Sequence, residues 1–524
     1  MKTIHKSLFV ITTLVFTIVF NSYAQSTFAR TYYTNDTSLF AKSMVKSFDN
    51  KYLICGNINE SHSFYVMIDS LGNSICSKTI NAKGSFSDVI STNDSCFVFA
   101  GHIYNDIDST DNFFCMKISD NGNIIWSKEI DFGSDESVNS IQQTIDNGFI
   151  LAGYSEYYPY SARGKSIIVK LDSVGNIDWC RRDSISNYHC ATLSVTQAND
   201  SGFIAVGSMM DPQIGGNSTR FYVMRLNFDG AIAWFKRDNN LEGYKSKASD
   251  VVTTATGFTI FAEMEIPYNN MVLIHTDFSG NISQVINWQH YTYWSSIKYP
   301  NKIKKLHNND LILVTPSGLS PIVNTQNTVF EYQYFFDGVA DCAITDDGGF
   351  FVLGSGPIIY LKDVEDAIHF GIIKTDSTGY SDFCYEWTES FPIDTIDINL
   401  TDVSSFESNM YYIRNQPFQI IDFTLQDYDG CVGYTGSIEN ESDISSPFTI
   451  FPNPSDGIFQ IKFSSDIKKQ RLDIYVYNSL GQKIFSGHSG NNFQIDLRNQ
   501  PDGIYFTRII YGNNEWSQII IKKY

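Results

Sequence analysis

Aromatic side chains that could hold a ligand gather in two places outside the regular pattern of this chain. They are Tyr157, Tyr158 and Tyr160 in one place, and Trp288, Tyr291, Tyr293 and Trp294 in the other. Flat rings beside hydrogen-bonding groups suit the faces of sugars and the hot spots of protein interfaces. Both clusters are therefore candidate binding sites for a glycan or a protein. The alternative interpretation is that the rings cap an irregular part of the fold and are half-buried.

Residue patterns for known catalytic chemistry are missing from the sequence. It contains no HExxH, CxxC, GxSxG or GxxxxGK[ST] motif, and residues 487–490 lack the spacing of a nucleophile elbow. We expect His102 and His275, which follow strand ends, to be structural. No residue is assigned a catalytic role, and no cofactor is predicted. An enzyme would need carboxylates that the fold brings together from distant parts of the chain.

Oxygen-bearing side chains also gather in the loop from Asp106 to Asn112. Calcium prefers such ligands, but this loop lacks the central glycine and the terminal glutamate of an EF-hand. We therefore expect a solvated acidic loop and no metal site.

The chain has nine cysteines, so they cannot all pair within one molecule. Two disulfides are candidates in an oxidising compartment, Cys180 with Cys190 and Cys384 with Cys431. Cys55 and Cys115 lie inside apolar stretches, and we expect them to be small buried residues.

A sequence repeat of roughly fifty residues, present seven times, carries these side chains. The clearest copy, residues 141–182, has an Asp-Asn-Gly turn, an apolar run ending at Gly153, and a second turn from Asp172 to Gly175. The closing glycine recurs at Gly56, Gly101, Gly153, Gly207 and Gly354. The fifth copy has Ala262 there, and the sixth copy is irregular. A period of this length is typical of propellers, solenoids or arrays.

Each copy predicts four short strands, because apolar, aromatic-rich segments alternate with Asp-Gly and Asp-x-x-Gly turns. We predict an all-β fold in which residues 25–380 form a β-propeller of about seven four-stranded blades. Six or eight blades are alternatives because the sixth copy is irregular. An array of sandwiches fits less well, since a sandwich needs about one hundred residues.

The segments that flank the repeats carry two further expectations. Residues 27–32 resemble a fourth-strand segment such as 126–128, so we predict that they complete the last blade beside the seventh copy. Residues 381–445 show alternation at 395–400 and 418–423 but no repeat signature. We expect a few strands there that connect the propeller to a C-terminal module, followed by a polar linker at 437–446.

The N-terminus predicts export. Lys2 and Lys6 precede a short apolar run that ends before Ala24 and Gln25, which is the pattern of a signal peptide at residues 1–24 with cleavage between these two residues. No later stretch is apolar for eighteen residues, so no transmembrane segment is predicted. The formal net charge of −20 argues against a nucleic-acid partner, because phosphate contacts need clustered Lys and Arg.

Residues 446–524 differ from the repeats and predict a small β-sandwich of alternating strands with proline and glycine at the turns. Its conspicuous motif residues are Pro452, Asn453, Pro454, Gly457, Gly481, Gln482, Gly503, Ile504 and Tyr505. Their order, followed by a lysine-bearing last strand, resembles the type A C-terminal sorting domain of the type IX secretion system of Bacteroidetes. The DGGF and KxDxxGNxxW repeats also resemble propeller-like repeats of such cargo.

The resemblance implies a partner and a location. In that family the domain is read by the type IX translocon and commonly removed, and the cargo is released or attached to surface lipopolysaccharide. We therefore expect a protein that passes through the periplasm and is secreted or held at the outer surface. Our leading hypothesis is a non-catalytic propeller that binds a glycan, peptide or protein. The alternative is an extracellular polysaccharide hydrolase or lyase that uses the propeller channel.

Overall fold

A computed structural model of the chain contains forty strands and no helix among the residues that it describes. These residues are 27–429 and 448–523, apart from 35–36, 156–163, 185–189, 211–218, 240–244, 267, 290–301, 307–309, 323–327, 334–337, 357–368, 382–386, 395–399, 403–405, 408–411, 416–419, 424, 454, 464–472, 479–482, 489–492, 502 and 512–513. The chain divides into two compact units, Met1–Gly433 and Tyr434–Tyr524. We call them the repeat unit and the C-terminal unit.

Each of the first six repeats has four antiparallel strands that follow one another in sequence, and the seventh has three. The first two repeats comprise β2 (Leu39–Lys46), β3 (Tyr52–Ile58), β4 (His62–Ile68), β5 (Ser74–Ser91), β6 (Phe97–Asn105), β7 (Thr110–Ile118) and β8 (Ile124–Asp131). The long strand β5 is both the last strand of the first repeat and the first strand of the second. The third and fourth comprise β9 (Glu136–Gln143), β10 (Phe149–Ser155), β11 (Lys165–Leu171), β12 (Ile177–Ser184), β13 (Cys190–Gln197), β14 (Phe203–Met210), β15 (Thr219–Leu226) and β16 (Ile232–Asp238).

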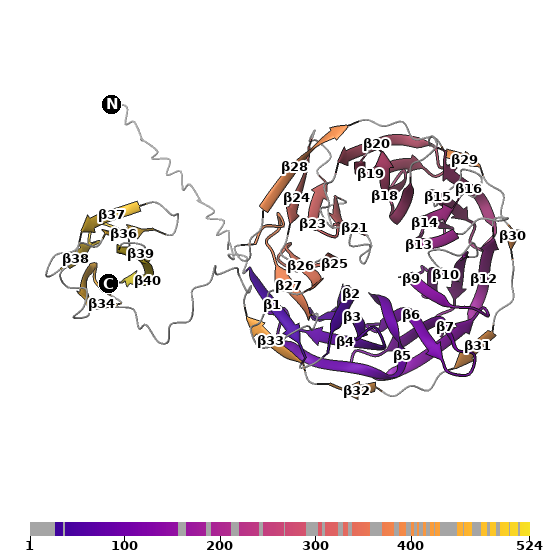
Figure 1. The fold of residues 1–524 in the computed structure, drawn as a ribbon, viewed down its shortest axis with the longest axis horizontal. Helices are drawn as coiled ribbons and strands as arrows, with labels where there is room; N and C mark the ends of the chain where they lie inside the picture. Colours follow the sequence, from indigo (N-terminus) through magenta and orange to yellow (C-terminus); the bar gives the residue numbers. More distant parts are fainter. Residues whose placement is uncertain are drawn as a thin grey trace, which may run out of the picture. The chain divides into compact units, whose positions relative to one another are not determined.

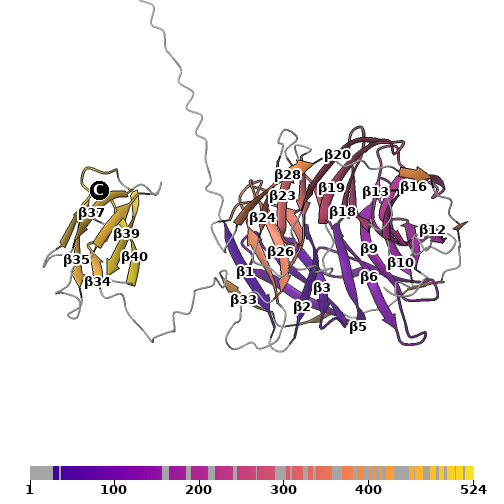
Figure 2. The same ribbon diagram turned by 45° about the horizontal axis from the view of Figure 1, so that its top comes forward.

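The last three repeats follow the same order. They comprise β17 (Ser246–Thr253), β18 (Gly257–Ile266), β19 (Tyr268–Asp277) and β20 (Ile282–Gln289), then β21 (Lys302–Lys305), β22 (Leu311–Val314), β23 (Gly318–Ile322) and β24 (Thr328–Gln333), then β25 (Gly338–Ile344), β26 (Phe350–Gly356) and β27 (His369–Lys374). Figures 1 and 2 show the repeats succeeding one another around a ring, with the first strand of each repeat nearest the centre.

The N-terminal strand β1 (Phe28–Tyr33) supplies the fourth strand of the seventh repeat. It pairs antiparallel with β27, from Phe28 opposite Lys374 to Tyr32 opposite Phe370. The prediction that this segment stands beside the seventh copy is therefore confirmed. The first and last parts of the ring are joined through this pairing.

Seven hydrophobic clusters hold the ring together, and each draws its buried side chains from two successive repeats. Phe64 of the first repeat shares one cluster with Phe351 of the seventh, whereas Cys55 shares the next cluster with Phe99 of the second. The other clusters join the remaining neighbours in order. Because both faces of each sheet are covered, the second and third strands read as unbroken apolar runs rather than as alternating patterns.

The region expected to hold a few connecting strands contains six short ones in the described part of residues 387–429, and all six pair with the repeats. They are β28 (Trp387–Asp394), β29 (Leu400–Asp402), β30 (Phe406–Glu407), β31 (Tyr412–Asn415), β32 (Ile420–Asp422) and β33 (Gln426–Asp429). β28 pairs with the fourth strands of both the fifth and the sixth repeats. The others pair in turn with the fourth strands of the fourth, third, second, first and seventh repeats.

We call these six strands the outer belt, because Figure 1 shows them along the rim of the ring. The belt runs against the order of the repeats and gives every one of them an additional outer strand. An uncovered edge strand is a template for pairing with another chain, so the belt protects edges that the repeats would otherwise present.

The C-terminal unit has two sheets that share one core. One consists of β34 (Phe448–Phe451), β35 (Ile458–Phe463) and β38 (Phe493–Asp496). The other consists of β36 (Asp473–Tyr477), β37 (Lys483–His488), β39 (Gly503–Tyr511) and β40 (Asn514–Lys522). Phe459 and Ile495 from the first sheet pack with Val476 and Ile520 from the second, as the expected small sandwich requires.

Candidate functional site

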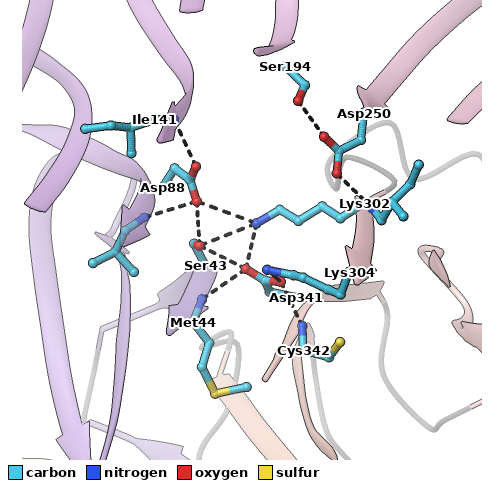
Figure 3. Close-up of polar contacts among 12 residues, drawn as sticks. Ser43, Met44, Asp88, Ile141, Ser194, Asp250, Lys302, Lys304, Asp341 and Cys342 are labelled. Atoms are coloured by element: carbon cyan, nitrogen blue, oxygen red, sulfur yellow. Dashed lines mark hydrogen bonds and ion pairs between the residues drawn. The ribbon is translucent and has the colours of Figure 1, made fainter. Parts of the chain in front are cut away.

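The innermost strands place one residue of each repeat at a common position near the centre of the ring. This residue lies opposite the one that precedes the closing glycine, as Asp88 lies opposite Ala100. The set comprises Ser43, Asp88, Ser140, Ser194, Asp250, Lys302 and Asp341. We call it the axial ring, and Figure 3 shows six of its members from different strands turned toward one another.

A β-bulge precedes this position in six of the seven innermost strands. The register of β5, for example, shifts between Phe86 and Asp88, and that of β17 shifts between Ala248 and Asp250. Bulges re-aim the side chains beside them. They therefore direct the polar side chain toward the neighbouring repeat at a position where regular pleating would not.

Asp88 and Asp250 make the same three hydrogen bonds. Asp88 accepts from the Ser43 hydroxyl at 2.8 Å, and from the backbone N–H groups of Val89 and Ile141 at 3.1 Å each. Asp250 accepts from the Ser194 hydroxyl at 2.5 Å, and from the N–H groups of Val251 and Ile303 at 2.8 Å each. In both cases the hydroxyl comes from the preceding repeat and one N–H comes from the following repeat (Figure 3).

Asp341 makes the same kinds of hydrogen bond, although both its hydroxyl donor and one N–H donor come from the following repeat, and it adds two ion pairs. It accepts from Ser43 Oγ at 2.9 Å and from the N–H groups of Met44 and Cys342 at 3.1 and 2.8 Å. The ammonium groups of Lys302 and Lys304 lie 2.7 Å from its two oxygens. Its side chain is fully buried.

The pKa values follow from these contacts. Burial alone would raise the pKa of Asp341, but Lys302 and Lys304 outweigh it and hold that pKa well below its usual range. Burial likewise opposes the charge of Lys304, yet Asp341 raises the pKa of this lysine. Burial raises the pKa of Asp250, and its three hydrogen bonds and the charge of Lys304 offset this rise only in part. The three groups thus depend on one another across the fifth, sixth and seventh repeats.

This arrangement is better suited to holding neighbouring repeats together than to catalysis. A general base must reach the proton of a substrate through an available lone pair. The three carboxylates of the axial ring are instead occupied by donors from their own and adjoining repeats. Charge-assisted hydrogen bonds of this kind fix one repeat against the next.

A second polar contact recurs where the two sequence motifs of a repeat meet. The cation of the third strand pairs with the aspartate of the first turn, as Lys117 does with Asp94 at 2.7 Å and Lys170 with Asp146 at 2.9 Å. The same contact joins Arg225 to Asp200 and Lys374 to Asp347. All four cationic side chains are at most 7% exposed. This buried pair explains why the aspartate-glycine turn and the lysine of the KxD motif occur together.

The aromatic candidates are not brought together on the described surface. Tyr157, Tyr158, Tyr160, Tyr291, Tyr293 and Trp294 lie outside the described residues. Trp288 is fully buried in β20 and stacks on Phe261 at 6.2 Å, so its interpretation as an exposed binding ring is wrong. The reason is its place in a fourth strand, where it packs between the fifth and sixth repeats.

The cysteine predictions are settled in part. Cys180 and Cys190 do not form the expected disulfide. Cys180 lies on the fourth strand of the third repeat and packs toward the second, whereas Cys190 lies on the innermost strand of the fourth. Cys384 and Cys431 lie outside the described residues. Cys55 and Cys115 are buried as predicted, and burial raises the pKa of both thiols, that of Cys115 to about 12.

Both histidines contact neighbouring hydroxyl groups within the fold. His102 Nδ1 lies 3.3 Å from Ser137 Oγ, and burial lowers the pKa of His102 to about 4. His275 Nδ1 lies 2.9 Å from Thr259 Oγ1. Within the described part of the chain, no three His, Cys, Asp or Glu side chains are grouped so that they could hold a metal ion.

Among the described motif residues of the C-terminal unit, Gly457 and Tyr505 lie near the last strand, β40. Gly457 accepts a hydrogen bond from Leu497 N at 2.7 Å, and a Cβ on Gly457 would lie 3.0 Å from Lys522 Cε. Lys522 in turn donates to Gln500 O at 2.7 Å, and Tyr505 donates to Pro501 O. The regions around Gly457 and Gln500 therefore both contact the last strand at Lys522. Pro454, Gly481 and Gln482 lie outside the described residues, as do Ala24 and Gln25 of the expected signal peptide.

Comparison with known families identifies the C-terminal unit. Residues 449–523 match the family described as secretion system C-terminal sorting domain. No curated protein sequence matches this chain. Among the described residues, no helix has the length and apolar character needed to cross a membrane. A sorting domain of this kind implies a protein secreted by the type IX machinery.

Two solved structures from B. thetaiotaomicron are similar to the chain at low identity. One is the extracellular domain of a protein described as the hybrid two component system BT4673, with 10% identity and a TM-score of 0.25, over 92% of this chain and 74% of that one. The other is the extracellular domain described as the one component system BT4673, with 9% identity and a TM-score of 0.19, over 95% and 99% of the two chains. TM-scores this low do not establish a shared fold.

The sequence predictions did not include the axial ring. Its signal was present, because a polar residue stands at the same place on the innermost strand of all seven repeats. The sequence alone does not reveal the bulges, however, and without them this position looks like an ordinary alternation of strand residues.

Proposed function

We propose that this secreted protein is a non-catalytic β-propeller of seven four-stranded blades that binds a glycan, peptide or protein outside the cell. The closed succession of repeats supports the architecture, since one hydrophobic cluster joins the seventh repeat to the first. After export the sorting domain is removed, and the propeller is either released or attached to surface lipopolysaccharide. The expected signal peptide at residues 1–24 starts this route.

The occupancy of the axial carboxylates is the observation that carries the non-catalytic assignment. The blades of a propeller surround a central channel, and the carboxylates nearest to it here, those of Asp88, Asp250 and Asp341, make contacts between blades. A scaffold with rigid blades leaves ligand recognition to turns and loops at its faces. Binding is therefore supported better than hydrolysis or elimination in the channel.

A paired screen tests this proposal. The purified full-length protein is applied to a glycan array and, in parallel, incubated with a panel of polysaccharides whose reducing ends are measured over time. Binding without release of reducing ends is expected. Release of sugars that is lost in an Asp88→Asn variant would replace the proposal with the hydrolase or lyase alternative.

A further inference from the structure

The first repeat departs from the buried ion pair that the second, third, fourth and seventh repeats share. Met67 stands opposite Cys76 at the position where Lys117 stands opposite Trp126 in the second repeat. A methionine cannot pair with the turn aspartate, Asp49. Lys51, which lies in the same turn, pairs with Asp49 instead.

This exchange moves the cation from the interior to the surface. The Lys51 side chain is 40% exposed, whereas the Lys117 side chain is 7% exposed. The residue at the position of Lys51 is Cys96 in the second repeat and a glycine in the third, fourth and seventh repeats. In the third repeat the cation fills the space beside this glycine, since a Cβ on Gly148 would lie 2.5 Å from Lys170 Nζ. The first repeat has therefore changed two positions together, one in the turn and one in the third strand.

A pocket opens where the charged head group is missing. It has a volume of about 220 Å³ and lies between the first and second repeats. Met67 and Phe97 are its buried floor. At the next junction the ammonium group of Lys117 lies over Phe149, the counterpart of Phe97, with 5.8 Å between the nitrogen and the ring centroid. The pocket at the first junction thus includes space that the lysine head group occupies at the next junction.

The rim of the pocket combines a flat apolar ring with polar groups. Phe48 is 66% exposed, and its side chain lines the pocket. Asp49, Lys51 and Asp120 also line the pocket. Lys51 and Ser47 donate hydrogen bonds to Asp49 that lower its pKa, so this carboxylate is ionised and accepts hydrogen bonds at neutral pH.

We propose that this pocket binds one neutral sugar ring of a glycan, with the C–H face of the sugar on Phe48 and its hydroxyl groups on Asp49, Asp120 and Lys51. Aromatic rings with adjacent polar groups suit such amphipathic faces. Two carboxylates disfavour an anionic ligand, and Lys51 between them disfavours a cationic one. The volume lies below the roughly 300–1,000 Å³ of sites for drug-sized ligands, which fits a single ring with the rest of the glycan in solvent. This proposal rests on the binding function proposed above and specifies its ligand.

Isothermal titration calorimetry on the full-length protein tests the pocket. The probes are cellopentaose, xylopentaose, mannopentaose and maltopentaose, with trigalacturonic acid and the deacetylated chitosan trimer as charged comparators. We expect at least one neutral probe to bind, and Phe48→Ala and Met67→Lys each to weaken that binding about tenfold or more. Met67→Lys restores the side chain that the repeat pattern places there, so it fills the pocket with little change to the fold. Ile145→Ala is the matched control, because Ile145 holds the turn position of Phe48 in the third repeat and is 70% exposed.

The outcomes separate this inference from the broader function. Neutral-sugar binding that survives both Phe48→Ala and Met67→Lys would overturn the pocket and leave a glycan-binding propeller in place. Binding of a charged comparator alone would overturn the assigned ligand class. Absence of binding by all neutral probes would overturn the inference, while the glycan array would still decide the broader proposal. Thermal unfolding of each variant shows whether it is folded. If Met67→Lys does not fold, Phe48→Ala still tests the pocket, because Phe48 is exposed.

Discussion

The ring of Phe28 lies directly against Gly72, although 44 positions separate them in the chain. A Cβ atom on Gly72 would come within 2.9 Å of Phe28 Cε2. The same contact recurs around the ring, with Trp126 against Gly175, Trp179 against Gly230 and Trp234 against Gly280. In each case an aromatic residue of one fourth strand covers the turn glycine of the next repeat. Phe28 performs this role from β1, so the N-terminal strand reproduces the side-chain contacts of a fourth strand as well as its backbone pairing.

Replacement of Phe28 by alanine is expected to weaken the closure of the ring. Because Phe28 is half-buried against the cluster shared by the seventh and first repeats, we expect a loss of about 2 kcal/mol in unfolding free energy. Urea unfolding followed by tryptophan fluorescence measures it. The exposed Phe48→Ala variant is the control and should change the free energy by less than about 0.5 kcal/mol. Equal effects from the two substitutions would contradict the role assigned to Phe28.

The substitution Asp341→Asn tests the axial ring. It preserves an acceptor for Met44 N but leaves the charges of Lys302 and Lys304 without their buried partner. Breaking a buried ion pair from one side costs about 3–5 kcal/mol, and we expect a loss near the lower value. Asp346→Asn is the control, since Asp346 makes an exposed ion pair with Lys46 worth about 0–1 kcal/mol. Calorimetric unfolding that gave the two variants the same midpoint would argue against a structural role for the ring.

Glu136, at the start of β9, is a buried carboxyl group with an unusual titration. It accepts hydrogen bonds from Ser134 N at 2.9 Å and Ser134 Oγ at 2.8 Å. Burial nevertheless raises its pKa to about 8 from an ordinary 4.5, and Asp131 adds to the rise. The folded protein therefore binds more protons at this residue than the unfolded chain does between these two values.

The raised pKa of Glu136 makes the folded protein less stable as the pH rises. The stabilisation linked to protonated Glu136 is fully present below about pH 4.5 and is lost as the pH rises through 8. Glu136→Gln cannot ionise, so we expect its stability to fall about 1–3 kcal/mol less than that of the parent between pH 5 and pH 8. The midpoints of urea unfolding at pH 5 and pH 8 measure this difference, and Glu265→Gln, at an exposed position, is the control. Parallel pH profiles for parent and Glu136→Gln would refute the assignment.

Two truncations distinguish the outer belt from a connector. A chain that ends after Gly433 keeps β28 to β33, and we expect it to remain folded and monomeric. A chain that ends after Ser381 lacks them and exposes the fourth strands of the repeats, so we expect association through sheet edges. Light scattering after size exclusion measures both. A monomeric, equally stable shorter chain would show that the belt is dispensable.

Removal of the C-terminal unit tests its role as an address. Because this unit has its own core, the chain that ends after Gly433 should fold yet remain in the periplasm of a host with type IX machinery. Fractionation of cells that express the full-length and truncated chains gives the measurement. Equal amounts of both at the cell surface would rule out the sorting assignment for this unit.

Much of the repeat unit could be predicted from sequence because its signals are local. Turn glycines and aromatic positions defined the four strands of each repeat, and the likeness of residues 27–32 to a fourth strand predicted the pairing of β1 with β27. The pairing of the outer belt with the repeats was not predicted, because its strands are only two to eight residues long and pair with strands that are distant in sequence. The axial ring depends on bulges. The burial of Trp288 and the absence of a disulfide at Cys180 depend on which strands pack against each other. All of these are tertiary properties.

The pairing of β1 with β33 has a consequence for how this unit can be rewired. Arg30 lies opposite Asp429, so the first and last strands of the unit are neighbours in one sheet. A short peptide between them would join the two ends without crossing the ring, and new termini could then be opened at a turn such as Asp172 to Gly175. By the same geometry, the whole unit could be grafted into a surface loop of another protein through a single narrow attachment point. Its first and last strands, β1 and β33, lie side by side.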